Sequence, residues 1–328
     1  MDNVRCRRPA MKSLVGAMLA FAASAGAASA VDPALPHYEP RAFAVPAAPA
    51  RIVGYNDMHD LLEPIVRRFM AAHPGVAIEL DLPGTRFAPA ALATGESALA
   101  PMGAEFTPPQ LADYRLRAGG DPVAFRVAHA SLDARALSGP LAVFVHQDNP
   151  LPSLSLAQLH RVFSGAVRTW GELGLTGAWS QEPIAIYGLQ GGTALAHEMR
   201  RRTLGEADFA PALRGFPQSA QVVERVGQDL RGIGFAAAMR ATSEVRALPL
   251  APSDGAPPVA PTVDNLIAGR YPLDRPLLIY ARPPLSPFAR EFLRLVLSRE
   301  GQQAVADTPQ RYLPLSAAEA AEELAKLD

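Results

Sequence analysis

The chain has 328 residues, and 49% of them are hydrophobic, so it can bury a sizeable core and suits two lobes better than one. Its formal net charge of −1 excludes a general nucleic-acid-binding surface. The single cysteine is Cys6, so the remainder of the chain has no disulfide, thiol nucleophile or cysteine metal site.

The first 30 residues have the pattern of a secretory signal peptide. Basic residues precede a short apolar run at residues 14–22, and small residues at 28–30 form a cleavage site. A start at Met11 would leave a signal of the same kind. Because the run is short for a span of ~20 residues, we expect cleavage and a periplasmic or secreted protein, with an uncleaved anchor as the alternative. Residues 31–50, rich in Pro and Ala, are expected to be a flexible leader.

Short apolar strands alternate with helices in the first half of the mature chain. The expected strands are 51–53, 76–82, 98–102 and 123–129, and helices follow the first three, ending near residues 72, 94 and 114. This alternation indicates a parallel sheet covered by helices, in which ligands gather at the carboxyl ends of the strands. The loops at Asn56, Thr85 and Gly103 should therefore share one edge.

The second half continues in the same mixed style. Expected strands lie at 139–146, 184–186, 233–237 and 276–281, and expected helices at 155–163, 219–228, 262–268, 287–297 and 317–327. Residues 251–261 are rich in proline and predict a surface connection.

Residues 183–202 contain the most informative local pattern. A short strand leads into a glycine-rich turn at residues 188–192, and Thr193 then opens a helix as its N-cap. Free N–H groups at a helix N-terminus make a plausible seat for an anion. An ordinary strand–turn–helix connection is the alternative.

Four motifs occur in a fixed order: VFSGAVRTWGEL at 162–173, GLQGGT at 188–193, GIGFA at 232–236 and GRYPLDRPLLIY at 269–280. Together they resemble the phosphate-binding solute receptors of ABC importers, over residues 51 to about 315. The resemblance implies a two-lobed α/β fold of the periplasmic-binding-protein-like type II class, with mixed sheets flanked by helices and a hinge. Lobe I would comprise residues 51–138 plus about 245–328, and lobe II residues 139–244.

The resemblance also implies that four loops converge on a cleft between the lobes. The ligand-binding residues it implies are Asn56, Asp57, Met58, Gly84, Thr85, Arg86, Gly103, Tyr187, Gln190, Gly191, Gly192 and Thr193.

This chain departs from the family pattern at several of these positions. Tyr187 stands where the family has arginine, Gly191 where it has serine, and Asp57 where it has a hydroxyl residue. The stretch at residues 97–104 lacks the family's aspartate, serine and arginine. Asp57 beside a phosphate would cost about 4 kcal/mol for unit charges ~4 Å apart at an effective dielectric near 20. A proton shared between Asp57 and the ligand, or the charge of Arg86, would offset that cost.

The sequence therefore predicts an exported solute-binding protein that captures a small oxyanion, phosphate foremost, for an ABC permease in the inner membrane. A pocket rebuilt for another solute, or a non-transport binding or adhesion module on the same fold, is the alternative. We expect a monomer that is not an enzyme and has no nucleic-acid partner, cofactor or metal. No G-x-S-x-G elbow supports a hydrolase. Asp57, His59 and Asp60 suit helix capping; Glu198 suits a solvated helix face and residues 200–202 a charged outer face.

Overall fold

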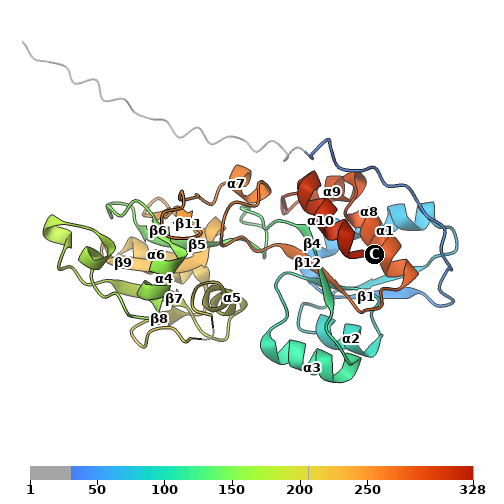
Figure 1. Ribbon diagram of the computed structural model, residues 1–328, viewed down its shortest axis with the longest axis horizontal. Helices are drawn as coiled ribbons and strands as arrows, with labels where there is room; N and C mark the ends of the chain where they lie inside the picture. Colours follow the sequence, from blue (N-terminus) through green and yellow to red (C-terminus); the bar gives the residue numbers. More distant parts are fainter. Residues whose placement is uncertain (1–30, 206, 328) are drawn as a thin grey trace, which may run out of the picture.

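The computed structural model describes residues 31–205 and 207–327. The chain forms two lobes that lie side by side and are joined by two extended crossover segments (Figure 1). Each lobe has its own hydrophobic core. Ala136 and Leu277 belong to the core of lobe I, whereas Leu141 and Leu273 belong to that of lobe II, so the chain crosses between these pairs.

Lobe I is built on mixed strands. β1 (Ala50–Val53) and β2 (Ile78–Asp81) are parallel, and an isolated parallel bridge between Ile52 and Leu99 brings β3 (Ala100–Met102) alongside. β12 (Leu277–Ala281) runs antiparallel between β3 and β4 (Val123–Ala128). The sheet thus combines strands from both ends of the chain.

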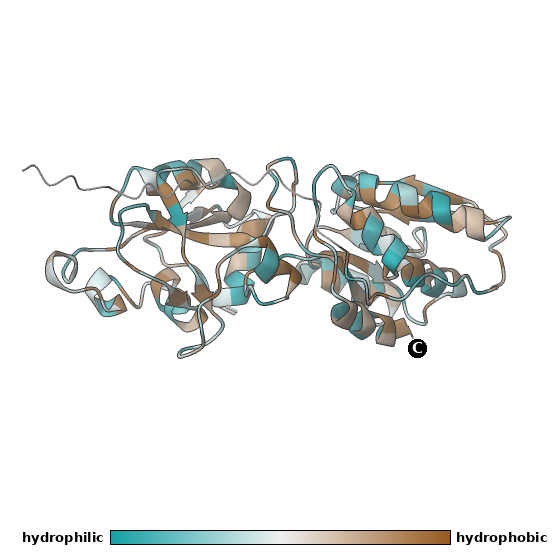
Figure 2. Ribbon diagram, turned by 90° about the horizontal axis from the view of Figure 1, so that it is seen from above, coloured by the Kyte–Doolittle hydropathy of each residue, from teal (hydrophilic) through white to brown (hydrophobic). Residues whose placement is uncertain are grey.

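Helices flank these strands. They are η1 (Asn56–Met58), α1 (His59–Ala72), α2 (Ala88–Thr94), α3 (Pro108–Ala118), α8 (Pro287–Val296), α9 (Arg299–Ala306), α10 (Ala317–Leu324) and η5 (Ala325–Leu327). The apolar side chains of α1 recur at helical spacing from Leu61 to Phe69 and are buried in the core. Figure 2 shows hydrophobic strands inside the lobes and hydrophilic residues on the exposed helix faces.

Lobe II contains a five-stranded sheet in the order β10–β5–β9–β7–β8. The strands are β5 (Leu141–His146), β7 (Ala185–Leu189), β8 (Arg214–Phe216), β9 (Gly232–Ala237) and β10 (Val245–Ala247). β7 is parallel to β8 and β9, so the loops after β7 and β8 lie at one edge. A small pair, β6 (Leu154–Ser155) and β11 (Leu250–Ala251), lies beside it.

The remaining helices of lobe II are α4 (Leu156–Phe163), η2 (Trp170–Leu173), η3 (Gly177–Trp179), α5 (Ala194–Thr203), α6 (Ser219–Gly227), η4 (Ala238–Arg240) and α7 (Val263–Ile267). α5 lies on the side of lobe II that faces lobe I (Figure 1). None of the helices that the structure describes has the length and apolar character needed to cross a membrane.

Two expected boundaries are wrong. The chain returns to lobe I near residue 275 rather than near 245, because β10 pairs with β5 and Leu266, Tyr271 and Leu273 join the core of lobe II. Residues 31–50, expected to be a flexible leader, instead pack along lobe I: Leu35 is buried, and Tyr38 and Phe43 pack against the core. The predicted signal peptide lies outside the described residues.

Candidate functional site

A cleft of about 280 Å³ opens between the two lobes. Its walls come from the loops after β1, β2, β3, β7 and β8 and from both crossover segments. The lining residues are Tyr55, Thr85, Gly103, Ala104, Leu137, Ser138, Leu189, Thr193, Ala194, Leu195, Pro217, Ser219 and Arg275.

Lobe II presents the N-termini of two helices to the cleft. The Thr193 hydroxyl accepts a hydrogen bond from Ala196 N (3.2 Å) and donates to Gln190 O (3.0 Å), which caps α5. The N–H groups of Ala194 and Leu195 lie in the first turn, where an α-helix supplies no backbone acceptor. Ser219 is the first residue of α6. This face therefore offers N–H donors and the positive ends of two helix dipoles.

Lobe I presents hydroxyl groups that already contact one another. Ser138 Oγ lies 3.1 Å from Tyr55 Oη and donates to Gly103 O at 3.3 Å. A Cβ atom on Gly103 would lie 2.4 Å from the Tyr55 ring, so this close approach requires glycine. Burial raises the pKa of Tyr55 to about 12, so its hydroxyl keeps its proton at neutral pH.

Arg275 is the one charged residue among the lining residues of the described chain. Its Nη1 donates to Gly139 O (3.3 Å) and its Nη2 to Gly103 O (3.2 Å), which ties both crossover segments to lobe I. The residue is 6% exposed. Burial lowers the pKa of Arg275, but a guanidinium titrates so far above neutral pH that the charge is kept. The cleft thus has a fixed positive charge at the hinge, the region where the two crossover segments run between the lobes.

The structure brings together only part of the residue set expected from the sequence. Thr85, Gly103 and Thr193 line the cleft. The remaining expected residues do not line the cleft: Asn56, Asp57, Met58, Gly84, Arg86, Tyr187, Gln190, Gly191 and Gly192.

In the first loop, Asp57 faces the hinge region. Its Oδ2 accepts hydrogen bonds from Leu137 N (2.9 Å) and from the Tyr312 hydroxyl. Asp57 itself does not line the cleft, and its carboxylate is held by these two donors, so the idea that it repels a bound anion loses its geometric basis. Met58 is fully buried in the core of lobe I, and Asn56 is exposed.

In the second loop, Gly84 N donates to Gly54 O (2.9 Å), so this glycine shapes the turn that presents Thr85. The guanidinium of Arg86 stacks over the Phe87 ring, 4.5 Å from its centroid. Arg86 is exposed and does not supply the missing charge within the cleft.

On β7, Tyr187 is buried beneath the glycine turn. Its hydroxyl donates to Asp229 Oδ2 (2.8 Å) and accepts from Arg214 Nη1 (3.2 Å). Leu189, two residues later, lines the cleft instead. Gln190 N donates to Phe216 O (2.9 Å), and Gly191 and Gly192 are exposed.

Sequence reasoning missed four polar lining residues, Tyr55, Ser138, Ser219 and Arg275. Arg275 stands within the motif GRYPLDRPLLIY, so that motif was the signal that could have found it. The other three are single polar residues next to loops or helix starts, and no local pattern distinguishes them.

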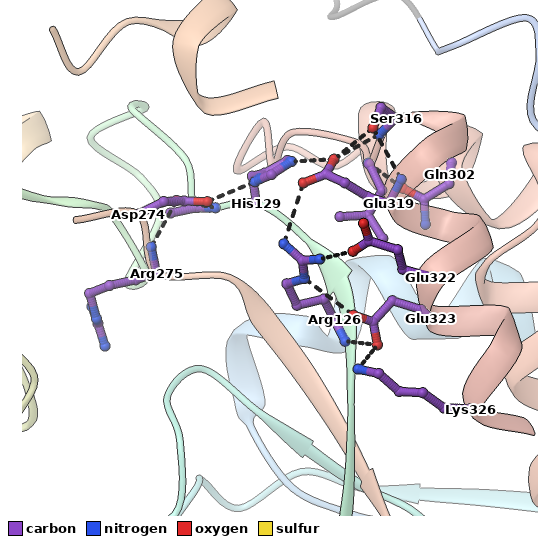
Figure 3. A network of polar contacts seen from close by, with 12 residues as sticks. Arg126, His129, Asp274, Arg275, Gln302, Ser316, Glu319, Glu322, Glu323 and Lys326 are labelled. Carbon is purple, nitrogen blue, oxygen red and sulfur yellow. Dashed lines mark hydrogen bonds and ion pairs between the residues drawn. The ribbon is translucent and has the colours of Figure 1, made fainter. Parts of the chain in front are cut away.

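An ionic network supports the hinge beside Arg275 (Figure 3). The buried His129 ring contacts Asp274 Oδ2 through Nδ1 (2.7 Å) and Glu319 Oε2 through Nε2 (3.1 Å). Burial alone would lower the pKa of His129, but these two carboxylates outweigh it and raise the pKa to about 9. Arg126 also contacts Glu319, at 3.4 Å. A protonated His129 therefore joins the second crossover to lobe I.

The basic end of α5 crosses toward lobe I and the hinge, so the expected outer face is wrong for two arginines. Arg201 Nη2 contacts Glu105 Oε1 across the lobes (2.9 Å), and Arg202 Nη2 donates to Asp274 O (3.2 Å). Glu198, expected on a solvated face, is buried and pairs with both arginines. Arg200 alone pairs within lobe II, with Asp208.

Comparison with known proteins agrees with this architecture. The model of the PBP superfamily domain matches residues 50–300. The phosphate-binding protein PstS of Pseudomonas aeruginosa is 35% identical over 322 residues, covering 94% of this chain and 96% of that protein.

Two solved structures share the fold. An ABC-type phosphate transport receptor from Vibrio cholerae aligns with a TM-score of 0.55 and 18% identity, over 80% of this chain and 99% of that one. PstS from Borrelia burgdorferi aligns with a TM-score of 0.56 and 14% identity, over 81% and 98%. The expected two-lobed type II fold is confirmed, and the chain belongs to the PBP superfamily and, within it, to the family of the phosphate-binding protein PstS.

Proposed function

We propose that the protein is an exported receptor that captures a small tetrahedral oxyanion in the interlobe cleft and delivers it to an ABC permease. Inorganic phosphate is the first candidate, because the relatives are named phosphate-binding proteins. The receptor acts as a monomer outside the inner membrane.

One observation carries this proposal: the chemistry of the cleft lining. Two helix N-termini meet hydroxyl groups and the charged Arg275, and the described lining contains no carboxylate. Hydrogen bonds to a charged group contribute roughly 1.5–3 kcal/mol each, and helix N-termini add roughly 0.3–1 kcal/mol. Such a lining favours an anion over a cation or a neutral sugar.

Closure of the lobes would couple binding to recognition by the permease. An oxyanion held by lobe II donors and by Arg275 at the hinge stabilises the closed form over the open form, which shifts the population of the two. The contact between Glu105 and Arg201 already spans the lobes and would tighten in that closed form.

The test is a thermal-shift screen of residues 31–328 with phosphate, sulfate and molybdate at millimolar concentration. A ligand at about 100 times its Kd adds roughly 2.7 kcal/mol, which raises the Tm by several degrees. A shift with a tetrahedral oxyanion, and none with amino acids or sugars, is expected. A shift with a sugar or an amino acid alone would overturn the proposal.

Export has its own test. N-terminal sequencing of the protein recovered outside the cytoplasm should begin at Val31, directly after the small-residue site. A chain that retains residues 1–30 would contradict cleavage and favour the uncleaved anchor.

A further inference from the structure

We infer that Ser138 is the residue whose side-chain oxygen accepts the proton of bound phosphate, and that it makes the cleft select phosphate over sulfate. This inference rests on the proposed function, since it concerns the same cleft and the same ligand. At neutral pH phosphate carries at least one P–O–H group, whereas sulfate is fully ionised and has only acceptor oxygens. A phosphate enclosed by the lobes therefore needs an acceptor as well as donors.

The described lining of the cleft contains no carboxylate that could act as this acceptor. Asp57 lies outside the lining. The carbonyl oxygen of Gly103 is engaged, because Arg275 Nη2 (3.2 Å) and Ser138 Oγ (3.3 Å) both donate to it and a carbonyl oxygen has two lone pairs. Among the side chains of the described lining, the acceptor must therefore be a hydroxyl oxygen.

Ser138 is a hydroxyl whose own proton is already committed. It lines the cleft, is 1% exposed and donates to Gly103 O. Tyr55 Oη lies 3.1 Å from Ser138 Oγ and keeps its proton at neutral pH, because burial raises its pKa to about 12. A serine oxygen has two lone pairs, so one remains for a ligand even when Tyr55 donates to it. Ser138 thus meets a ligand as an acceptor, since a backbone carbonyl takes its proton.

Two hydroxyl groups on the lobe II side of the cleft are engaged differently. Thr193 donates its proton to Gln190 O, but its oxygen accepts from Ala196 N as the cap of α5. The oxygen of Ser219 accepts from Ala237 N (3.2 Å), and its proton has no acceptor among the described residues. Ser219 can therefore donate to any oxyanion, whether that ligand is protonated or not.

Titration calorimetry on the mature chain, residues 31–328, at neutral pH compares oxyanions with and without a proton. Phosphate and arsenate each keep a proton under these conditions, whereas sulfate has none. Sulfate would place an acceptor oxygen against the Ser138 oxygen, and neither atom would find a proton there. We expect phosphate and arsenate to bind about tenfold or more tightly than sulfate.

Three variants locate the selectivity. Ser138→Ala should weaken phosphate binding by about tenfold, because the P–O–H group loses its acceptor, and should not weaken sulfate binding. Ser219→Ala should weaken phosphate and sulfate binding by the same factor, about fivefold, because both lose a donor. Ser131→Ala is the matched control, a buried serine outside the cleft lining that donates to Gln310 O, and it should leave both affinities unchanged.

The outcomes separate the two proposals. Sulfate binding as tight as phosphate binding in the unmodified chain would overturn this inference and leave the proposed function standing. Unchanged phosphate binding in Ser138→Ala, or an equal loss for phosphate and sulfate, would also overturn it, since Ser138 would then only shape the wall of the cleft. Binding of neither phosphate, nor arsenate, nor sulfate by the unmodified chain would overturn both.

Discussion

The two faces of the cleft use their polar groups differently. In lobe I, the groups near the cleft are bonded to one another: Ser138 contacts Tyr55 and Gly103, and Asp57 is held by Leu137 and Tyr312. In lobe II, the Thr193 side chain caps α5 at Ala196 N, while Ala194 and Leu195, whose N–H groups have no acceptor within the helix, line the cleft. Lobe I therefore supplies a prearranged wall, and lobe II supplies the donors that a ligand can use.

The strongest test of this division is Arg275→Met, because Arg275 joins the lobe I wall to the hinge. Its loss leaves the carbonyl group of Gly139 without a donor and that of Gly103 with only the Ser138 hydroxyl, and an unpaired buried acceptor costs roughly 1–3 kcal/mol. We expect the free energy of unfolding to fall by about 3 kcal/mol and oxyanion binding to be lost. Urea denaturation and calorimetry measure both, with the exposed Arg240→Met as control. Unchanged binding would show that lobe II acts alone.

The ionic network around His129 should make the free energy of unfolding depend on pH. The N–H donors of lobe II should not change over the same pH range. The folded pKa of His129 is about 9 and its usual value about 6.5, so its stabilisation is complete below pH ~6.5 and disappears as pH rises through 9. We expect up to about 3 kcal/mol to be lost over this window. Denaturation at several pH values should give this slope, and His129→Gln should flatten it. An unchanged slope in the variant would remove His129 as the cause.

Asp57→Ala and Thr193→Ala compare the two faces directly. Asp57→Ala should lower stability by about 3 kcal/mol, since two hydrogen bonds to a charged group are lost, but change oxyanion affinity by less than about threefold. Thr193→Ala should cost about 1 kcal/mol as a lost N-cap and weaken binding by about fivefold. Calorimetry measures the oxyanion affinity of both variants, and melting curves measure their stability. A clear gain of affinity in Asp57→Ala would restore the idea that Asp57 repels the ligand.

The smallest effect is expected where the faces meet, at Glu105 and Arg201. Both side chains are more than a third exposed, so the pair contributes less than about 1 kcal/mol. Glu105→Gln should weaken ligand binding by less than about threefold, and only at low ionic strength, because salt screens exposed pairs. Calorimetry at low and high salt tests this, with Arg200→Ala as control, since that arginine pairs within lobe II. An equal effect of both changes would argue against a contact between lobes.

The sequence predicted the fold better than the site. Local apolar periodicity predicted the strands and helices and the glycine turn before α5, and the resemblance carried by the four ordered motifs implied the two-lobed fold. The direction of a side chain depends on distant partners. The orientation of the Asp57 side chain is set by hydrogen bonds from Leu137 and Tyr312, far along the chain, and that of Tyr187 by its bond to Asp229. Neither orientation was predictable from the local motif.

The predicted return of the chain to lobe I near residue 245 is wrong for the same reason. β10 is three residues long, and its membership is decided by pairing with β5, a hundred residues earlier. A short strand has too little pattern to indicate its partner. The prediction of a flexible leader is wrong because its proline and alanine content suggests a loose chain, whereas the Tyr38 hydroxyl bonds to His73, directly after α1, and to Glu291 in α8.

That leader has a consequence for the order of folding. Lobe II is one continuous piece of chain, but lobe I joins the first residues to the last: Asp32 accepts a hydrogen bond from Ala317 N, and Pro36 O from Arg299 N. A chain that emerges from its N-terminus can complete lobe II while lobe I still lacks β12 and the helices that follow it. Until then the apolar face of α1 lacks the neighbours that α8 and α9 supply, so the unfinished lobe I is the species most exposed to aggregation and to proteases. A chain stopped after residue 275 should therefore yield a protease-resistant lobe II and a degraded lobe I.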